Sequence, residues 1–226
     1  MGLLHSLSLL FFPRQCPVCG KVLVKGEKLF CTQCLAEFPW CDPDFPDNTD
    51  NIRNIPEDLR PDKIYSLFRY SKGADTKNLL FAIKYRNRPD LALELGNMLG
   101  KRLKDTLEGD LIIPVPLHPK RLRQRGYNQS SKIAEGISEA TGIPFSETVV
   151  SRIVNTSTQT GKNAEERFSS LNGAFRLDDE NAVRGKHIII ADDVITTGAT
   201  AGSCLKTISA AGKVRFTLVC IARTSL

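Results

Sequence analysis

Apolar residues from position 63 onwards follow two alternating spacings. Short runs, each with the length of a strand, cover 63–70, 111–115, 149–154, 175–177, 187–191 and 214–222. Between them, apolar residues recur at helical spacing over 74–85, 91–107, 125–141 and 199–211. Strands that alternate with helices build parallel sheets, so this pattern predicts an α/β fold. The loops after 115, 154 and 192 are expected to meet at one edge of the sheet and to form one site there.

The run 187–191 leads into two adjacent carboxylates. Its residues are apolar without alternation, as in a strand that is covered on both faces. Asp192 and Asp193 follow directly, and the small residues from Ala199 onwards are compatible with a helix. The sequence therefore predicts a strand, an acidic turn and a helix in succession.

Such a junction favours a bound phosphate. Backbone N–H groups at a helix start converge on one point, the helix dipole favours an anion, and Gly198 lets the backbone approach closely. The predicted phosphate-binding residues are Thr196, Thr197, Gly198, Ala199 and Thr200. Carboxylates accept hydrogen bonds from vicinal hydroxyls, so Asp192 and Asp193 beside this turn predict a sugar phosphate. The alternative is a helix cap followed by an ordinary turn, whereas no Gly-x-Gly-x-x-Gly supports a dinucleotide fold.

The charge of the chain favours anionic partners. Its 226 residues carry a formal net charge of +6, and 41% are hydrophobic, enough for one good core and a small appendage. The stretch 120–132 contains five basic residues and no acidic one. It follows a proline-rich loop, which predicts a site for polyphosphate or nucleic acid, and the alternative is a solvated basic surface.

Four of the seven cysteines form two Cys-x-x-Cys pairs, Cys16 with Cys19 and Cys31 with Cys34. Each pair can present two thiolates on one side of a tight loop, so the spacing predicts a structural Zn²⁺ site. Disulfides are the alternative and would require an oxidising compartment. Cys41 is left out of the predicted site because four ligands already complete it.

Composition predicts three parts: residues 1–45 with the zinc module, a linker over 46–62 that is rich in Pro, Asp and Asn, and the main domain over 63–226. The apolar residues 1–12 are too few to span a bilayer and lack a signal-peptide pattern, so we expect a cytoplasmic protein, with peripheral contact at the inner face of the membrane left open. The polar stretch 155–172 predicts a flap over the site.

The stretch from Ile188 to Thr200 resembles the ribose 5-phosphate motif of type I phosphoribosyltransferases. Together with the four cysteines, Lys84-Tyr85, Pro114-Val-Pro-Leu and the Arg-Gly-Tyr-Asn-Gln segment, it makes the whole chain similar to the ComF family. That resemblance implies a zinc module on a phosphoribosyltransferase domain, linked to natural competence and single-stranded DNA uptake in natural transformation. It also implies binding of 5-phosphoribosyl 1-pyrophosphate with Mg²⁺.

The resemblance implies roles for further residues. Asp192 and Asp193 would act on the ribose, as the catalytic pair. The implied pyrophosphate loop comprises Leu117, His118, Lys120, Arg121 and Arg125, and the implied flap residues are Gln159, Lys162 and Arg167.

Three functions remain open from the sequence. The first is pentosyl transfer to an acceptor that no residue identifies. The second is binding of single-stranded DNA, with Tyr127, Phe38 or Trp40 stacking on bases. The third is a zinc-ribbon partner for a competence helicase or another uptake protein, with the pocket vestigial. The intact acidic pair argues against a vestigial pocket.

Overall fold

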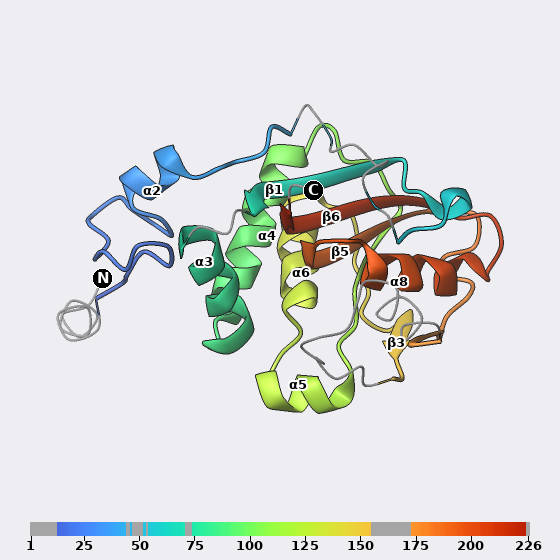
Figure 1. Cartoon of the computed structure of the whole chain (residues 1–226). Helices are drawn as coiled ribbons and strands as arrows, with labels where there is room; N and C mark the ends of the chain where they lie inside the picture. Colours follow the sequence, from blue (N-terminus) through green and yellow to red (C-terminus); the bar gives the residue numbers. More distant parts are fainter. Residues whose placement is uncertain are drawn as a thin grey trace.

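Four of the predicted apolar runs form one parallel sheet in the computed structural model, which describes residues 13–43, 46, 52, 54–70, 74–154 and 173–224. The strands are β1 (Lys63–Tyr70), β6 (Arg215–Thr224), β5 (His187–Ile195) and β2 (Leu111–Pro114), and they lie in the order β1-β6-β5-β2 (Figure 1). Every neighbouring pair in this sheet is parallel. The predicted α/β fold class is confirmed.

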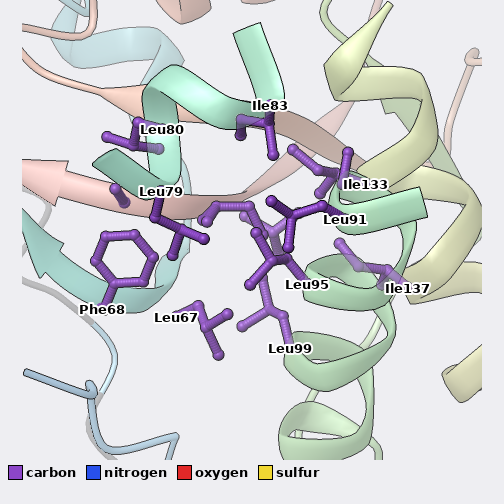
Figure 2. Packing of buried hydrophobic residues seen from close by; sticks show 14 of the residues in the cluster. Leu67, Phe68, Leu79, Leu80, Ile83, Leu91, Leu95, Leu99, Ile133 and Ile137 are labelled. Atoms are coloured by element: carbon purple, nitrogen blue, oxygen red, sulfur yellow. The ribbon is translucent and has the colours of Figure 1, made fainter. Parts of the chain in front are cut away.

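Helices cover both faces of the sheet. The helices α3 (Ala74–Tyr85), α4 (Pro89–Leu103) and α6 (Gln129–Thr141) share one hydrophobic core (Figure 2). Ile189 of β5 belongs to the same core. Helix α8 (Ala199–Ser209) shares a second core with Ile188 and Ile190. Because successive residues of a strand point to opposite faces, the unbroken apolar run of β5 supplies both cores.

Two helices of the first core approach very closely. A Cβ atom added at Gly96 of α4 would lie 2.2 Å from the carbonyl oxygen of Ile133, and one added at Gly136 of α6 would lie 2.1 Å from that of Leu93. Glycine is therefore required at both positions. This packing fixes the start of α6 against the carboxyl end of the sheet.

The prediction for 149–154 was wrong in one respect. Strand β3 (Val150–Arg152) does not join the parallel sheet but pairs antiparallel with β4 (Phe175–Leu177). The free edge of β2 is already taken, because Ile112 donates its N–H to Pro144 and accepts from the N–H of Ser146. The chain thus closes the sheet edge before β3 begins.

Several element boundaries also differ from the predicted ones, among them those of α4 and β5. Helix α4 ends at Leu103, short of the predicted residue 107. Strand β5 continues through Ile195, so the acidic pair lies within the strand and the turn begins after it. The reason is that β6 is long enough to keep pairing, with Asp192 opposite Cys220 and Ile195 opposite Arg223.

The N-terminal residues that are described pack onto the first core. Phe38 and Trp40 contact Phe68 of β1 edge to face, and Cys41 donates its N–H to the carbonyl of Leu67. Helix α2 (Thr32–Glu37) belongs to this N-terminal part and lies at the left of the view in Figure 1.

The predicted linker over 46–62 is only partly described, and some of its described residues are packed. Ile52 and Ile55 are buried in the α8 core, and a short 3₁₀ helix, η1 (Glu57–Leu59), leads into β1. The described residues contain no helix that is long and apolar enough to cross a membrane. The predictions for residues 1–12 lie outside them.

Candidate functional site

The acidic pair lies at the carboxyl end of β5, past the last residue of β2. Asp193 is 5% exposed and faces the α3, α4 and α6 side. Its Oδ1 lies 3.0 Å from Nζ of Lys84, and its Oδ2 accepts a hydrogen bond of 2.7 Å from Nε2 of Gln129. Both carboxylate oxygens are therefore paired within the protein.

Asp192 also faces the start of α6 but has different partners. Its Oδ1 accepts hydrogen bonds from Oγ of Ser130 at 3.0 Å and from the N–H of Asp193 at 2.8 Å. Burial, together with the neighbouring Asp193 carboxylate, raises the pKa of Asp192 to about 7, although Lys84 and the two hydrogen bonds oppose the shift. Asp192 therefore holds or releases a proton near neutral pH.

The start of α6 brings Gln129 and Ser130 to the acidic pair, and two neighbouring residues hold this helix end in place. Asn128 caps the helix by accepting from the N–H of Ser130, and its Nδ2 donates to the carbonyl of Val115 at 3.1 Å. Tyr127 donates its hydroxyl proton to the carbonyl of Ile83 and so ties α6 to the end of α3. The positive end of the helix dipole thereby faces the carboxylates.

Sequence reasoning missed Lys84, Gln129 and Ser130 as site residues. Lys84-Tyr85 and the segment that ends at Gln129 contributed to the family resemblance, but nothing local indicated contact with the acidic pair. Lys84 reaches it from α3, and the other two reach it from α6.

The predicted phosphate turn connects β5 to α8. Gly198 has a left-handed φ of 79° and precedes the helix without a side-chain cap. In the first hydrogen bond of the helix, Gly202 donates its N–H to the carbonyl of Gly198. The N–H groups over 199–201 therefore have no partner within the helix. Thr196 is exposed, and Thr197 and Thr200 are partly exposed.

The structure gives a further reason for glycine at position 198, beside the predicted approach of the backbone to a phosphate. A Cβ atom at this position would lie 2.0 Å from Cγ2 of Ile52, so the close neighbour is a side chain of the preceding segment. Asn54 also donates its N–H to the carbonyl of Thr197 at 3.2 Å. Ile52 and Asn54 thus hold the turn from outside.

The basic stretch is a helix rather than a loop. Helix α5 (Pro119–Arg125) begins with proline at its first position, and Nδ1 of His118 caps it by accepting from the N–H of Lys120. Arg121 and Arg125 share a pocket of about 400 Å³ with Lys84. The other members of the predicted pyrophosphate loop lie elsewhere: Leu117 borders a second pocket of about 410 Å³, and Lys120 is exposed.

The predicted flap residues, Gln159, Lys162 and Arg167, lie outside the described part of the chain. Arg152, which precedes that stretch, is 9% exposed and lies within electrostatic range of Asp192 and Arg121. Burial lowers the pKa of the Arg152 guanidinium. Sequence reasoning did not single out this residue, since it stands alone in a β-rich run.

The four predicted zinc ligands come together. The sulfur atoms of Cys16, Cys19, Cys31 and Cys34 all lie within 4.8 Å of one another, and those of Cys19 and Cys31 are 3.6 Å apart. Sulfurs at 2.3 Å from a tetrahedral Zn²⁺ are separated by about 3.8 Å, so the cluster fits this ion. Cys41 lies instead beside Oγ of Ser66, at 3.3 Å.

The thiols of this cluster differ in acidity. Burial opposes ionisation of Cys16, but backbone N–H groups of Cys19, Cys31 and Val18 outweigh it and lower the pKa to about 7. Burial and the neighbouring thiols raise the pKa of Cys34. No disulfide joins the described cysteines.

These features define a class of protein: a parallel α/β sheet with a carboxylate pair before a helix start, and a cysteine cluster that fits zinc. Among relatives, DNA utilization protein YhgH of Salmonella typhimurium is 27% identical over 215 residues, which cover 92% of this chain and 90% of that protein. Competence protein F of Haemophilus influenzae is 38% identical over 98 residues, 43% of each chain. Competence protein ComFC of Bacillus subtilis is 32% identical over 98 residues, 42% of this chain and 38% of that one.

The chain is a relative of these DNA-utilization and competence proteins, and the predicted ComF-like resemblance is confirmed. No protein-family model matches it. Solved structures similar to it include the allosteric regulatory enzyme of purine biosynthesis, at 22% identity and a TM-score of 0.42 over 62% of this chain and 30% of that one. Purine phosphoribosyltransferase from Pyrococcus horikoshii gives 19% identity and 0.36, over 62% and 77%.

Proposed function

We propose that this protein binds 5-phosphoribosyl 1-pyrophosphate with Mg²⁺ at the carboxyl end of β5 and transfers the pentosyl group. One observation carries the proposal: two carboxylates lie directly before the free N–H groups of α8 and face the start of α6. A phosphate at α8 would place its sugar beside Asp192 and Asp193.

The arrangement suits the chemistry of pentosyl transfer. Departure of pyrophosphate leaves positive charge on the sugar carbon, which nearby carboxylates stabilise. Lys84 and Gln129 hold the Asp193 carboxylate in place, so it needs little reorganisation when that charge develops. Arg121 and Arg125 lie beside Lys84, where they would neutralise the leaving pyrophosphate.

The residues present also fit Mg²⁺. This ion binds proteins through one or two carboxylates, keeps several waters and takes further oxygens from phosphates. The hydrogen bonds of the Asp192 carboxylate in the described structure are made by Oδ1, which leaves Oδ2 for the ion or its water. The ion would supply charge neutralisation of the bound phosphates.

Isothermal titration calorimetry tests this proposal with the sugar pyrophosphate and Mg²⁺. We expect the combined variant Asp192→Asn, Asp193→Asn to bind at least tenfold more weakly than the wild type, because hydroxyl acceptors and negative charge are lost. Glu180→Gln, in an exposed ion pair with Arg184, is the matched control and should bind normally. Equal affinity of the double variant and the wild type would refute the proposal.

A second candidate function is binding of single-stranded DNA, with uptake during natural competence as its context. The names of the relatives favour a role with DNA. The net charge of +6 and the basic helix α5 favour binding of phosphate backbones. We propose that such binding takes place in the cytoplasm, with a competence helicase or another uptake protein as a further partner.

We also propose that the cysteine cluster holds a structural Zn²⁺ ion and that residues 1–45, 46–62 and 63–226 act as module, linker and main domain. The fit of the four sulfur atoms supports the ion. Cys16 and Cys31 of the module belong to the same buried hydrophobic cluster as Phe68 of the main domain. This shared packing supports a module and a main domain that act together.

A further inference from the structure

Two large aromatic side chains stand exposed on helix α3. Phe81 is 47% exposed and Tyr85 is 63% exposed, one helical turn apart. Their ring centroids lie 5.0 Å apart, with the ring planes inclined by 40°. Neighbouring aromatic rings that a fold leaves in solvent mark a surface for a partner with flat, apolar groups.

Guanidinium groups flank both rings. Cζ of Arg86 lies 5.8 Å from the ring centroid of Phe81, and Cζ of Arg125 lies 5.3 Å from that of Tyr85. Arg125 belongs to α5, so two helices that are separate in the sequence build this surface. Arginine beside an exposed aromatic ring supplies charge for a phosphate at the place where a flat group would stack.

Tyr85 also lines the pocket of about 400 Å³ described above. Its walls carry three cations and two amides and no acidic group, since they consist of Lys84, Tyr85, Asn87, Arg121, Gln124 and Arg125. An aromatic wall with cationic and amide walls matches a nucleobase with its phosphates, because amides pair with base edges and cations with the backbone.

The aromatic residues that the sequence suggested for stacking are engaged elsewhere. Phe38 is 7% exposed and packs with Phe30, Trp40 and Phe68. Trp40 donates its indole N–H to the carbonyl of Leu35, and Tyr127 donates to Ile83. Their rings serve packing within the protein.

We propose that Phe81 and Tyr85 form a stacking platform for an unpaired base of a single-stranded nucleic acid, with Arg86, Arg121 and Arg125 binding the adjacent phosphates. The proposal rests on the second candidate function and locates its binding site. Lys84 connects the platform to the sugar-phosphate site, because it lines the pocket and pairs with Asp193 at 3.0 Å.

Fluorescence anisotropy with a labelled twenty-nucleotide oligo-dT tests the platform. Tyr85→Ala and Phe81→Ala should each weaken binding about tenfold, the effect of removing one base–aromatic stack. Tyr85→Phe keeps the ring and should stay within about twofold of the wild type. Leu35→Ala removes a side chain that is 47% exposed on α2 and serves as the control that should change nothing.

The probe itself provides a second test. An abasic strand of the same length keeps the phosphates but has nothing to stack, so it should bind the wild type weakly and be insensitive to Tyr85→Ala. An oligo-U strand of the same length distinguishes RNA from DNA as the natural source, and Tyr85→Ala must weaken whichever binds better. A duplex that binds with the same dependence on Tyr85 would overturn the proposal.

The experiment distinguishes failure of the DNA-binding function from failure of the stacking platform. If the wild type binds no oligonucleotide at low salt, the DNA-binding function itself is wrong. If the wild type binds, and neither Tyr85→Ala nor Phe81→Ala weakens binding, the platform is wrong and the strand lies elsewhere on the basic surface. Circular dichroism of each variant establishes that α3 is intact.

Discussion

The cysteine cluster and the acidic pair both gather reactive side chains, but by different means. All four sulfur atoms of the cluster come from residues 16–34, on two short turns. The acidic pair is contiguous, whereas Gln129 and Ser130 reach it across 64 and 62 positions of the chain, and Lys84 comes from a third segment. Local turn chemistry builds the first site, and the topology of the sheet builds the second.

This difference predicts how each site responds to damage. A metal that joins four ligands concentrates the stability of a small module in one ion, so loss of one ligand is severe. The acidic network divides its stabilisation among several hydrogen bonds and one ion pair, so each loss is modest. Three measurements can break or sharpen the comparison.

The largest effect should come from the cysteine cluster. Cys31→Ser, or removal of zinc with a strong chelator, should unfold the described N-terminal module, since structural zinc contributes roughly 10–16 kcal/mol in small zinc-binding peptides. Trp40 packs against Phe30 and Phe38 beside the cluster, so its fluorescence reports the loss. Metal analysis should find one zinc per chain in the wild type.

Cys204→Ala is the matched control for that measurement. Cys204 is also buried but lies in α8, away from the cluster, so zinc content should stay at one per chain. An unchanged Trp40 spectrum after complete chelation would show that the module does not depend on the metal.

An intermediate effect should follow pH through Asp192. Its folded-state pKa, about 7, lies above the ordinary value of 3.8, so the native state binds the proton more tightly than the unfolded chain. Stability should therefore fall as pH rises from about 4 to about 7 and level off above, by an amount on the order of 4 kcal/mol. Urea unfolding at a series of pH values measures this slope.

Asp192→Asn removes the titrating group but keeps the shape. Its stability should change less than that of the wild type over the same pH range. If stability changed with pH in the same way for both proteins, Asp192 would not be the group that titrates in this range.

The smallest effect should come from one distant contact. Ser130→Ala removes the hydroxyl that donates to Asp192, and one hydrogen bond of this kind contributes about 1 kcal/mol. Ser138 lies about two turns later on the same helix and does not contact the acidic pair in the described structure, so Ser138→Ala controls for helix propensity. Urea unfolding at pH 8, where Asp192 is ionised, measures both. A loss above about 4 kcal/mol would contradict a network of divided contributions.

Particular elements illustrate what the sequence allowed. The unbroken apolar run of β5 predicted a strand covered on both faces, and the parallel sheet confirms it. The extent of that strand was wrong, because β6 continues to pair beyond Asp192. The basic stretch was expected as a loop, but Pro119 and the His118 cap begin a helix there.

The sequence by itself determined the features whose causes are local. Strand and helix spacing, the two Cys-x-x-Cys turns and the adjacent carboxylates each depend on a few neighbouring residues, so their patterns can be recognised along the chain. Only the tertiary structure decided that Lys84 pairs with Asp193, that Ile52 packs against Gly198 and that Arg125 lies over Tyr85. These contacts join segments far apart in the chain, and they exist because the helices pack on the sheet in one particular order.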